Sequence, residues 1–133
     1  MKTAVRYYSR SGNTKLLAEA IAKGAGVPAV SVDVADAALS EQVDVLFIGG
    51  ALYAYGLDSH LKTYLAGLDG SKVKKAVIFS TSWLSKHSLA LIRDALTAKG
   101  IAVEEKTLYA KNKPSADYLK EAEEFAGKYI VEN

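Results

Sequence analysis

The 133-residue chain has no cysteine, which excludes disulfide bonds, thiolate nucleophiles and thiolate metal ligands. Proline is scarce too: Pro28 and Pro114 lie far apart, and no stretch has the composition of a linker. No apolar run approaches the roughly 18 residues that a membrane span needs, and no signal peptide is visible. These absences predict a single domain over residues 1–133 and a cytoplasmic location without a membrane span.

The sequence also lacks a large excess of either basic or acidic residues. The formal net charge is only +2, which gives no indication of a nucleic-acid partner. The distribution is nevertheless uneven, because residues 31–70 hold one basic and six acidic residues, whereas residues 71–100 hold six basic and one acidic residue. A run of Lys72, Lys74 and Lys75 precedes an apolar segment, and we interpret it as a solvated loop.

Several ligand-binding patterns are missing. The chain has neither the G-x-x-x-x-G-K-[ST] motif of nucleoside triphosphate sites nor the G-x-G-x-x-G motif of dinucleotide sites. A response-regulator receiver domain would need an aspartate after the third strand, where this chain has Gly49-Gly50. The two histidines, His60 and His87, have no partner histidine or cysteine, so we expect no metal site and interpret both as exposed.

The chain does contain a regular alternation of short apolar runs and amphipathic helical periods. Gly24 and Gly26 are expected to end the first helix, and Ser115 is a candidate cap for the last one. Parallel strands joined by right-handed helical crossovers predict an α/β fold, a doubly wound five-stranded parallel sheet with helices on both faces. Strands are expected over 3–8, 29–34, 43–48, 76–80 and 101–108, and helices over 14–23, 59–68, 86–99 and 116–129.

Ligands of such sheets collect beyond the carboxyl ends of the strands, which directs attention to the loops 8–14, 49–58 and 80–86. The first loop combines hydroxyl groups with Gly12, which permits a positive φ, at the N-terminus of a helix. Arg10 either adds charge there or points to solvent, and we favour solvent. The simpler alternative is a capped helix, but capping requires fewer polar groups. The loop therefore predicts a phosphate site made of Ser9, Arg10, Ser11, Gly12, Asn13 and Thr14.

The segment Ser9-Arg10-Ser11-Gly12-Asn13-Thr14 resembles the [ST]-x-[ST]-G-x-T phosphate loop of the flavodoxin family, which binds FMN. The motif follows the first strand and opens the first helix, and an alternation of five strands and five helices extends the resemblance over essentially the whole chain. The resemblance implies the sheet order 2-1-3-4-5 and an FMN-dependent electron carrier. It also implies that neutral donors hold the phosphate and that the chain works as a monomer with redox partner proteins.

The other two loops suit a flat aromatic ligand, because tyrosines flanked by glycines follow the third strand. The resemblance implies that this loop flips a peptide beside the flavin, with Gly56 as the candidate hinge, and that the loop after the fourth strand lines the other side of the ring. Trp83 either stacks on the ring, shields it, or packs in the core. The expected ring contacts are Ala51, Leu52, Tyr53, Ala54, Tyr55, Gly56, Ser80, Thr81, Ser82 and Trp83.

Two other functions stay open. The segments 50–54 and 61–65 are similar to those of quinone-dependent protoporphyrinogen dehydrogenases with a flavodoxin domain, but those chains are usually longer, so the carrier is favoured. A flavin-free module that binds a phosphorylated ligand or a protein would keep the same fold. Familiar flavodoxins are strongly acidic, whereas this chain is mildly basic, which predicts a less reducing flavin.

Overall fold

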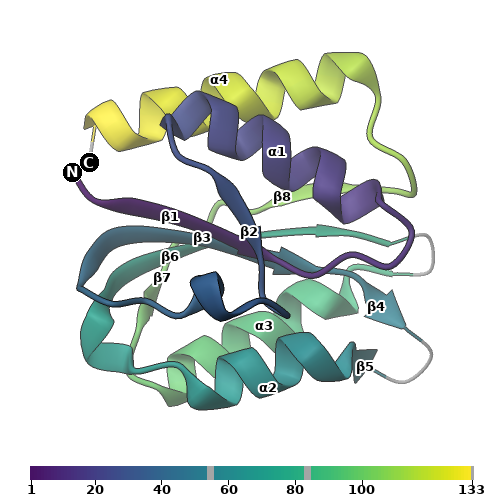
Figure 1. Cartoon of the computed structure of the whole chain (residues 1–133). Coiled ribbons are helices and arrows are strands. Elements are labelled where there is room, and N and C mark those ends of the chain that lie inside the picture. The colour runs from purple at the N-terminus through teal and green to yellow at the C-terminus, as the bar shows by residue number, and fades with distance from the viewer. Residues whose placement is uncertain (54–55, 83–84, 133) are drawn as a thin grey trace.

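The computed structural model describes residues 1–53, 56–82 and 85–132. A parallel sheet lies between two layers of helices, with the two chain termini close together (Figure 1). Three residues expected at the site, Ala54, Tyr55 and Trp83, lie outside the described residues. Within the described part of the chain, no helix combines the length and the apolar character that crossing a membrane would demand.

The sheet has the doubly wound topology expected from the sequence. Its hydrogen-bonded order is β2-β1-β3-β6-β7, with every pair parallel, and β8 also pairs with β6. This confirms the order 2-1-3-4-5, in which β7 and β8 share the last position. The strands are β1 (Thr3–Tyr7), β2 (Ala29–Ser31), β3 (Val43–Gly50), β6 (Val73–Thr81), β7 (Ala102–Val103) and β8 (Leu108–Ala110).

The edge strand corrects one expectation, because a continuous strand over 101–108 does not form. Val103 pairs with Ala76 and Leu108 pairs with Phe79. The segment 103–108 is therefore two residues longer than the segment 76–79 of β6 that it lies against. The residues between the two strands include the charged run 104–106. The Glu104 carboxylate accepts a hydrogen bond from the Tyr129 hydroxyl, 2.8 Å away. Charged, interrupted edges of this kind limit pairing with other chains.

Helices cover both faces of the sheet, as expected. Strand side chains alternate between the two faces, so each face packs its own apolar layer against its own helices. In β3, Leu46 and Ile48 face one layer while Val45 and Phe47 face the other. The helices α1 (Asn13–Ala25) and α4 (Ala116–Glu132) lie over one face, and α2 (Ser59–Gly67) and α3 (His87–Ala98) over the other (Figure 1).

The four helices expected from periodicity all form, whereas the five helices implied by the resemblance do not, because the described residues form four α-helices. The crossover from β2 to β3 contains only a 3-10 turn, η1 (Ala35–Ala37), and a second such turn, η2 (Gly70–Lys72), precedes β6. The connection runs over residues 32–42, and its apolar residues Val32 and Ala37 are buried without forming a longer helix. Hydrogen bonds from Arg6 Nε and the Tyr64 hydroxyl to the Ala37 carbonyl, 2.8 and 2.7 Å long, fix the turn instead.

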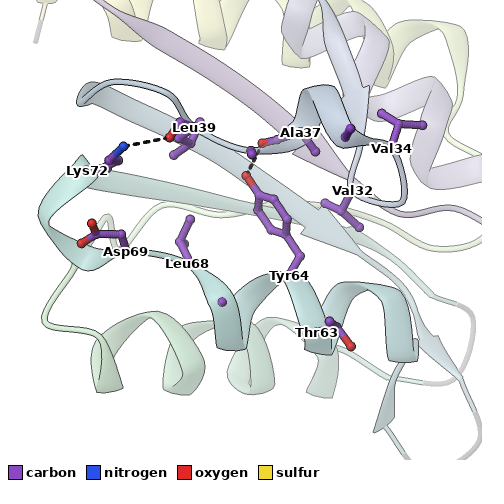
Figure 2. A pocket seen from close by; sticks show the side chains of 12 residues that line it. Val32, Val34, Ala37, Leu39, Thr63, Tyr64, Leu68, Asp69 and Lys72 are labelled. Atoms are coloured by element: carbon purple, nitrogen blue, oxygen red, sulfur yellow. Dashed lines mark hydrogen bonds between the residues drawn. The ribbon is translucent and has the colours of Figure 1, made fainter.

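A cavity of about 440 Å³ lies where this crossover passes α2. Figure 2 shows Val32, Leu39 and Leu68 as part of its wall, with Tyr64 reaching across it to Ala37. Lys72 closes one end by donating to the Leu39 and Ser40 carbonyls at 3.2 and 3.3 Å. None of the described residues that were expected at the site lines this cavity.

The lysine run is not a loop, which corrects its interpretation. Lys74 and Lys75 belong to β6, and Lys72 is the last residue of η2. Their side chains are partnered: Lys74 Nζ lies 3.3 Å from Asp44 and Lys75 Nζ lies 3.5 Å from Glu104.

The two glycines of α1 have different roles. Gly26 ends the helix as expected, in the left-handed conformation with φ 73°. Gly24 instead lies inside α1, so its expected role is wrong. A Cβ at Gly24 would overlap the Glu123 carbonyl of α4, which shows that glycine is required for the close packing of α1 on α4. At the start of α4, Ser115 Oγ accepts from the Tyr118 N–H at 3.1 Å, which confirms that cap.

Candidate functional site

Three loops from the carboxyl ends of β1, β3 and β6 meet at one edge of the sheet, as the topology predicted. The Arg10 N–H donates to the Tyr53 hydroxyl at 3.1 Å, which joins the first loop to the second. Thr14 Oγ1 and Thr81 Oγ1 are 2.6 Å apart, which joins the first loop to the third. Residues separated by up to 67 positions in sequence are thus joined by polar contacts, and the contact between Thr14 and Thr81 is buried.

The backbone conformation of the first loop depends on its glycine. Gly12 adopts φ 95°, the left-handed region expected for it, and nothing lies within 4 Å of a Cβ built there. Glycine is therefore required by the backbone conformation and not by close packing. Gly12 occupies the N-cap of α1 without a side-chain cap, so the N-terminus of α1 departs from the simple capped helix that was the alternative.

The hydroxyls of this loop bind its own backbone. Ser9 Oγ accepts from the Gly12 N–H at 3.0 Å, and Ser11 Oγ accepts from the Asn13 N–H at 3.4 Å. Thr14 is 1% exposed and its hydroxyl lies against Thr81. The loop is therefore ordered in the shape of a nest of N–H groups, with Ser11 exposed at its outer side.

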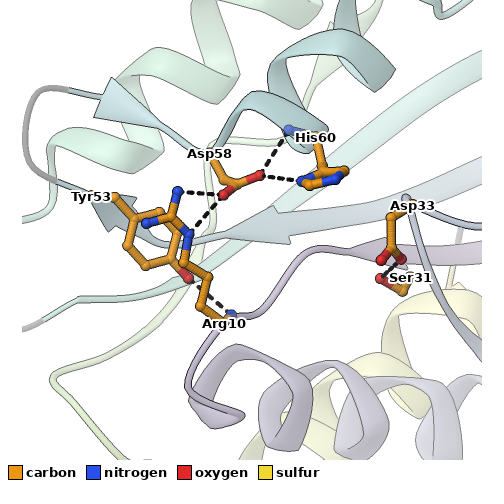
Figure 3. A network of polar contacts seen from close by, with 6 residues as sticks. All are labelled: Arg10, Ser31, Asp33, Tyr53, Asp58 and His60. Carbon is orange, nitrogen blue, oxygen red and sulfur yellow. Dashed lines mark hydrogen bonds and ion pairs between the residues drawn. The ribbon is translucent and has the colours of Figure 1, made fainter.

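Arg10 is half exposed but not free in solvent, contrary to the favoured expectation. Its Nε and Nη2 atoms donate to Asp58 Oδ2 at 2.7 and 2.6 Å, and its guanidinium carbon lies 4.0 Å from the centroid of the Tyr53 ring (Figure 3). The side chain of Asp58 is only 4% exposed, so its charge must be compensated inside the protein. Arg10 supplies that compensation.

Asp58 is the functional-site residue that sequence reasoning missed. Its Oδ1 accepts from the His60 N–H at 2.7 Å, which caps α2, and lies 2.9 Å from His60 Nδ1 (Figure 3). Burial acts to raise the pKa of the Asp58 carboxyl, but the hydrogen bonds from His60 and Arg10 outweigh it and hold the pKa below its ordinary value. An aspartate directly before a helical period was the available signal.

His60 is half exposed, with 52% of its side chain in solvent, which partly matches its interpretation as exposed. Its ring also stacks on Tyr8, with centroids 4.6 Å apart and planes 14° apart. His87 is exposed at the start of α3, as expected.

The second loop forms a small hairpin instead of an open loop. β4 (Leu52–Tyr53) pairs antiparallel with β5 (Gly56–Leu57), so Tyr53 lies opposite Gly56. Ala51, Leu52 and Tyr53 are half-buried, and burial raises the pKa of the Tyr53 hydroxyl. One face of the Tyr53 ring is occupied by Arg10.

The third loop is buried up to Ser82. The Ser80 hydroxyl donates to the Gly50 carbonyl and contacts Ser88 Oγ at 2.6 Å, so this side chain supports the second loop and α3. The Ser82 backbone is fixed by Ala110, whose carbonyl accepts from its N–H at 3.3 Å. Ser82 Oγ is buried but makes no hydrogen bond with the residues that the structure describes.

Comparison with solved structures identifies the class of protein. A flavodoxin from the domain Archaea superposes with a TM-score of 0.86 at 24% identity, covering 99% of this chain and 98% of that one. The two-electron reduced flavodoxin of Megasphaera elsdenii is 28% identical, with a TM-score of 0.70 and coverage of 95% and 98%. The Flv1 flavodiiron core from Synechocystis matches 98% of this chain and 35% of that chain, with 21% identity and a TM-score of 0.79.

No family model and no curated protein matches the chain. The structural likenesses nevertheless extend over nearly the full length of both chains in the two flavodoxins. The chain is therefore flavodoxin-like in fold, which confirms the fold implied by the resemblance first drawn from residues 9–14.

Proposed function

We propose that the chain is an FMN-binding electron-transfer protein. The observation that carries the proposal is the left-handed Gly12 at the start of α1, which shapes a nest of N–H and hydroxyl groups where three loops meet. When bound, FMN supplies the redox chemistry, and the protein supplies binding, orientation and electrostatics. Redox partner proteins would exchange electrons with it, and we propose a monomer that works in the cytoplasm.

The first loop would hold the phosphate with neutral donors. The Gly12 and Asn13 N–H groups bind the hydroxyls of Ser9 and Ser11, so the loop is already arranged before a phosphate takes their place as acceptor. A hydroxyl can accept and donate at once, which lets Thr14 accept from Thr81 while donating to a phosphate oxygen. The partial positive charge at the N-terminus of α1 adds to the attraction.

The third loop offers an independent test of fit. A buried hydroxyl without a partner is uncommon in proteins, and Ser82 Oγ, at the edge where the ring of FMN would lie, has no hydrogen-bond partner among residues 1–53, 56–82 and 85–132. A polar edge of the flavin would provide the missing partner. The other ring contacts in the proposal are Ala51, Leu52, Tyr53, Gly56 and Thr81, together with Ala54, Tyr55 and Trp83.

Titration with FMN, followed by flavin fluorescence, tests the proposal. We expect wild-type protein to quench the flavin and Ser11→Asp to weaken binding by about 100-fold, because a carboxylate beside the phosphate dianion repels it. Ser40→Asp is the matched control, since Ser40 is also exposed but lies just before β3, near the amino ends of the strands. If both variants bind FMN as wild type does, the phosphate does not occupy residues 9–14.

The same titration, together with an oxidation assay, separates the alternatives. A flavin-free module would show neither quenching nor an FMN-dependent rise in melting temperature. A quinone-dependent dehydrogenase would bind FMN but would also oxidise protoporphyrinogen with quinone as acceptor, whereas the proposed carrier would not.

A further inference from the structure

The connections that follow β6 and β8 carry positive charge and no negative charge. The sequence holds no acidic residue over 70–93 and none over 106–116. Lys86 lies at the start of α3, and Lys111 and Lys113 lie between β8 and α4. All three lysines are exposed, and none forms an ion pair with another of the described residues. We call these three residues the basic edge.

The backbone under the basic edge is fixed, and the two connections are bonded to each other. The Tyr109 hydroxyl donates to the carbonyls of Ser82 and Ser85 at 2.6 and 3.4 Å. The Asn112 N–H donates to the Ser82 carbonyl at 3.4 Å from a left-handed turn, with φ 59° at Asn112. Lys86 Nζ lies 5.3 Å from the centroid of the Tyr109 ring. The lysines therefore project from one ordered platform.

The platform borders the proposed flavin site. Ser82 belongs both to this platform and to the loop that we propose to contact the ring. Figure 1 shows the connection from β8 to α4 at the same edge of the sheet as the start of α1. On the β2 side, the exposed Asp33 accepts a hydrogen bond from the Ser31 hydroxyl at the carboxyl end of β2 (Figure 3). Charges of opposite sign thus flank the site.

We infer that the basic edge is the docking surface for an acidic redox partner protein. The inference rests on the proposed function, since a partner seated on Lys86, Lys111 and Lys113 would lie next to the bound flavin. Positive charge beside the site would attract and orient an acidic surface, and Asp33 on the far side would disfavour the reversed orientation. A nucleic-acid strand is disfavoured as the partner. Proteins that bind single strands expose aromatic rings on which bases stack, whereas the Tyr109 ring is half-buried with Lys86 near its face.

Binding to two small haem proteins of opposite charge tests the inference. The probes are an acidic cytochrome b5 and a basic cytochrome c, immobilised for surface plasmon resonance, with the chain injected both with and without FMN. We expect binding to the acidic probe that weakens by about tenfold between about 50 and 300 mM salt, and weaker binding to the basic probe.

Two variants of equal charge change locate the surface. Lys111→Gln/Lys113→Gln should weaken binding to the acidic probe by about fivefold or more, whereas Lys120→Gln/Lys128→Gln should change it by less than about twofold. The control lysines are also exposed, but they lie on α4. A slower electron transfer from the reduced flavin to the ferric haem at low salt, in the first variant alone, would add support.

Three results would overturn the inference. Equal losses in the two double variants would show that only net charge matters. Equal or tighter binding to the basic probe would contradict an acidic partner, and tighter binding of a single-stranded DNA, lost in Lys111→Gln/Lys113→Gln, would assign the surface to nucleic acid. Failure of the proposed function is seen separately, as a lack of FMN binding in titration, because the resonance measurement needs no flavin.

Discussion

The loops that follow β1 and β3 lie side by side but differ in charge. The nest around Gly12 presents backbone N–H groups and serine hydroxyls, all neutral. Directly beside it, Arg10, Asp58 and His60 form a charged network. Because Asp58 neutralises Arg10, the single cation of the phosphate loop is balanced by the protein itself. The difference shows how a loop can contain arginine and still offer a phosphate only neutral donors.

Among the variants that compare these two loops, Gly12→Ala should have the largest effect on FMN binding. Gly12→Ala forces a left-handed alanine, which costs about 1–2 kcal/mol of folding free energy, and should weaken FMN binding by about tenfold because the N–H groups lose their alignment. Gly67→Ala is the matched control, since Gly67 ends α2 with open space around it. It should be neutral or slightly stabilising. Equal effects in chemical denaturation and FMN titration would contradict the assigned role of Gly12.

Removing the charge of Asp58 should distinguish the role of the network of Arg10, Asp58 and His60 from the role of the nest. Asp58→Asn keeps a good helix cap for α2 but leaves Arg10 without its anion, and should lower the free energy of unfolding by about 1–2 kcal/mol. FMN binding should be retained or strengthened, because the released guanidinium can then reach the phosphate. Denaturation and FMN titration of the same preparation measure both quantities. A loss of FMN binding as large as that of Gly12→Ala would show that the network, and not the nest, holds the phosphate.

Acid should weaken the network before it affects the nest. The pKa of Asp58 is held below its ordinary value in the folded state, so its ionised form stabilises the fold fully above the unfolded pKa of about 3.9. That stability is lost as the pH falls through the folded pKa. The difference in unfolding free energy between wild type and Asp58→Asn should therefore shrink below about pH 4. A difference that stays constant from neutral to acidic pH would rule out this linkage.

The smallest effect should come from the hydrogen bond that joins the two loops. Tyr53→Phe removes the acceptor of the Arg10 N–H but keeps the ring beneath the guanidinium. We expect a loss of about 1 kcal/mol or less in unfolding free energy and little change in FMN affinity. Tyr118→Phe is a matched control, because its hydroxyl also accepts a backbone N–H, from Tyr109 at 2.8 Å, away from the nest. A much larger loss of FMN affinity in Tyr53→Phe would indicate that this bond shapes the nest.

Elements with a local cause were predicted well from the sequence. The positive φ of Gly12, the cap by Ser115 and the buried strand β3 each follow from residues within a few positions of one another. Elements with a distant cause were not. The role of Gly24 depends on Glu123 in another helix, and the break between β7 and β8 depends on their register with β6.

The sequence by itself determined the alternation of strands and helices and the loop that we propose to bind phosphate, because periodicity, glycine conformation and strand-to-helix order are properties of neighbouring residues. The strand order was implied by the family resemblance. Only the tertiary structure decided what Arg10 and Thr14 contact. Their partners, Asp58 and Thr81, are 48 and 67 positions away along the chain. No local preference encodes such pairs, since they form only when packing of the sheet brings its carboxyl ends together and buried polar groups must find partners there.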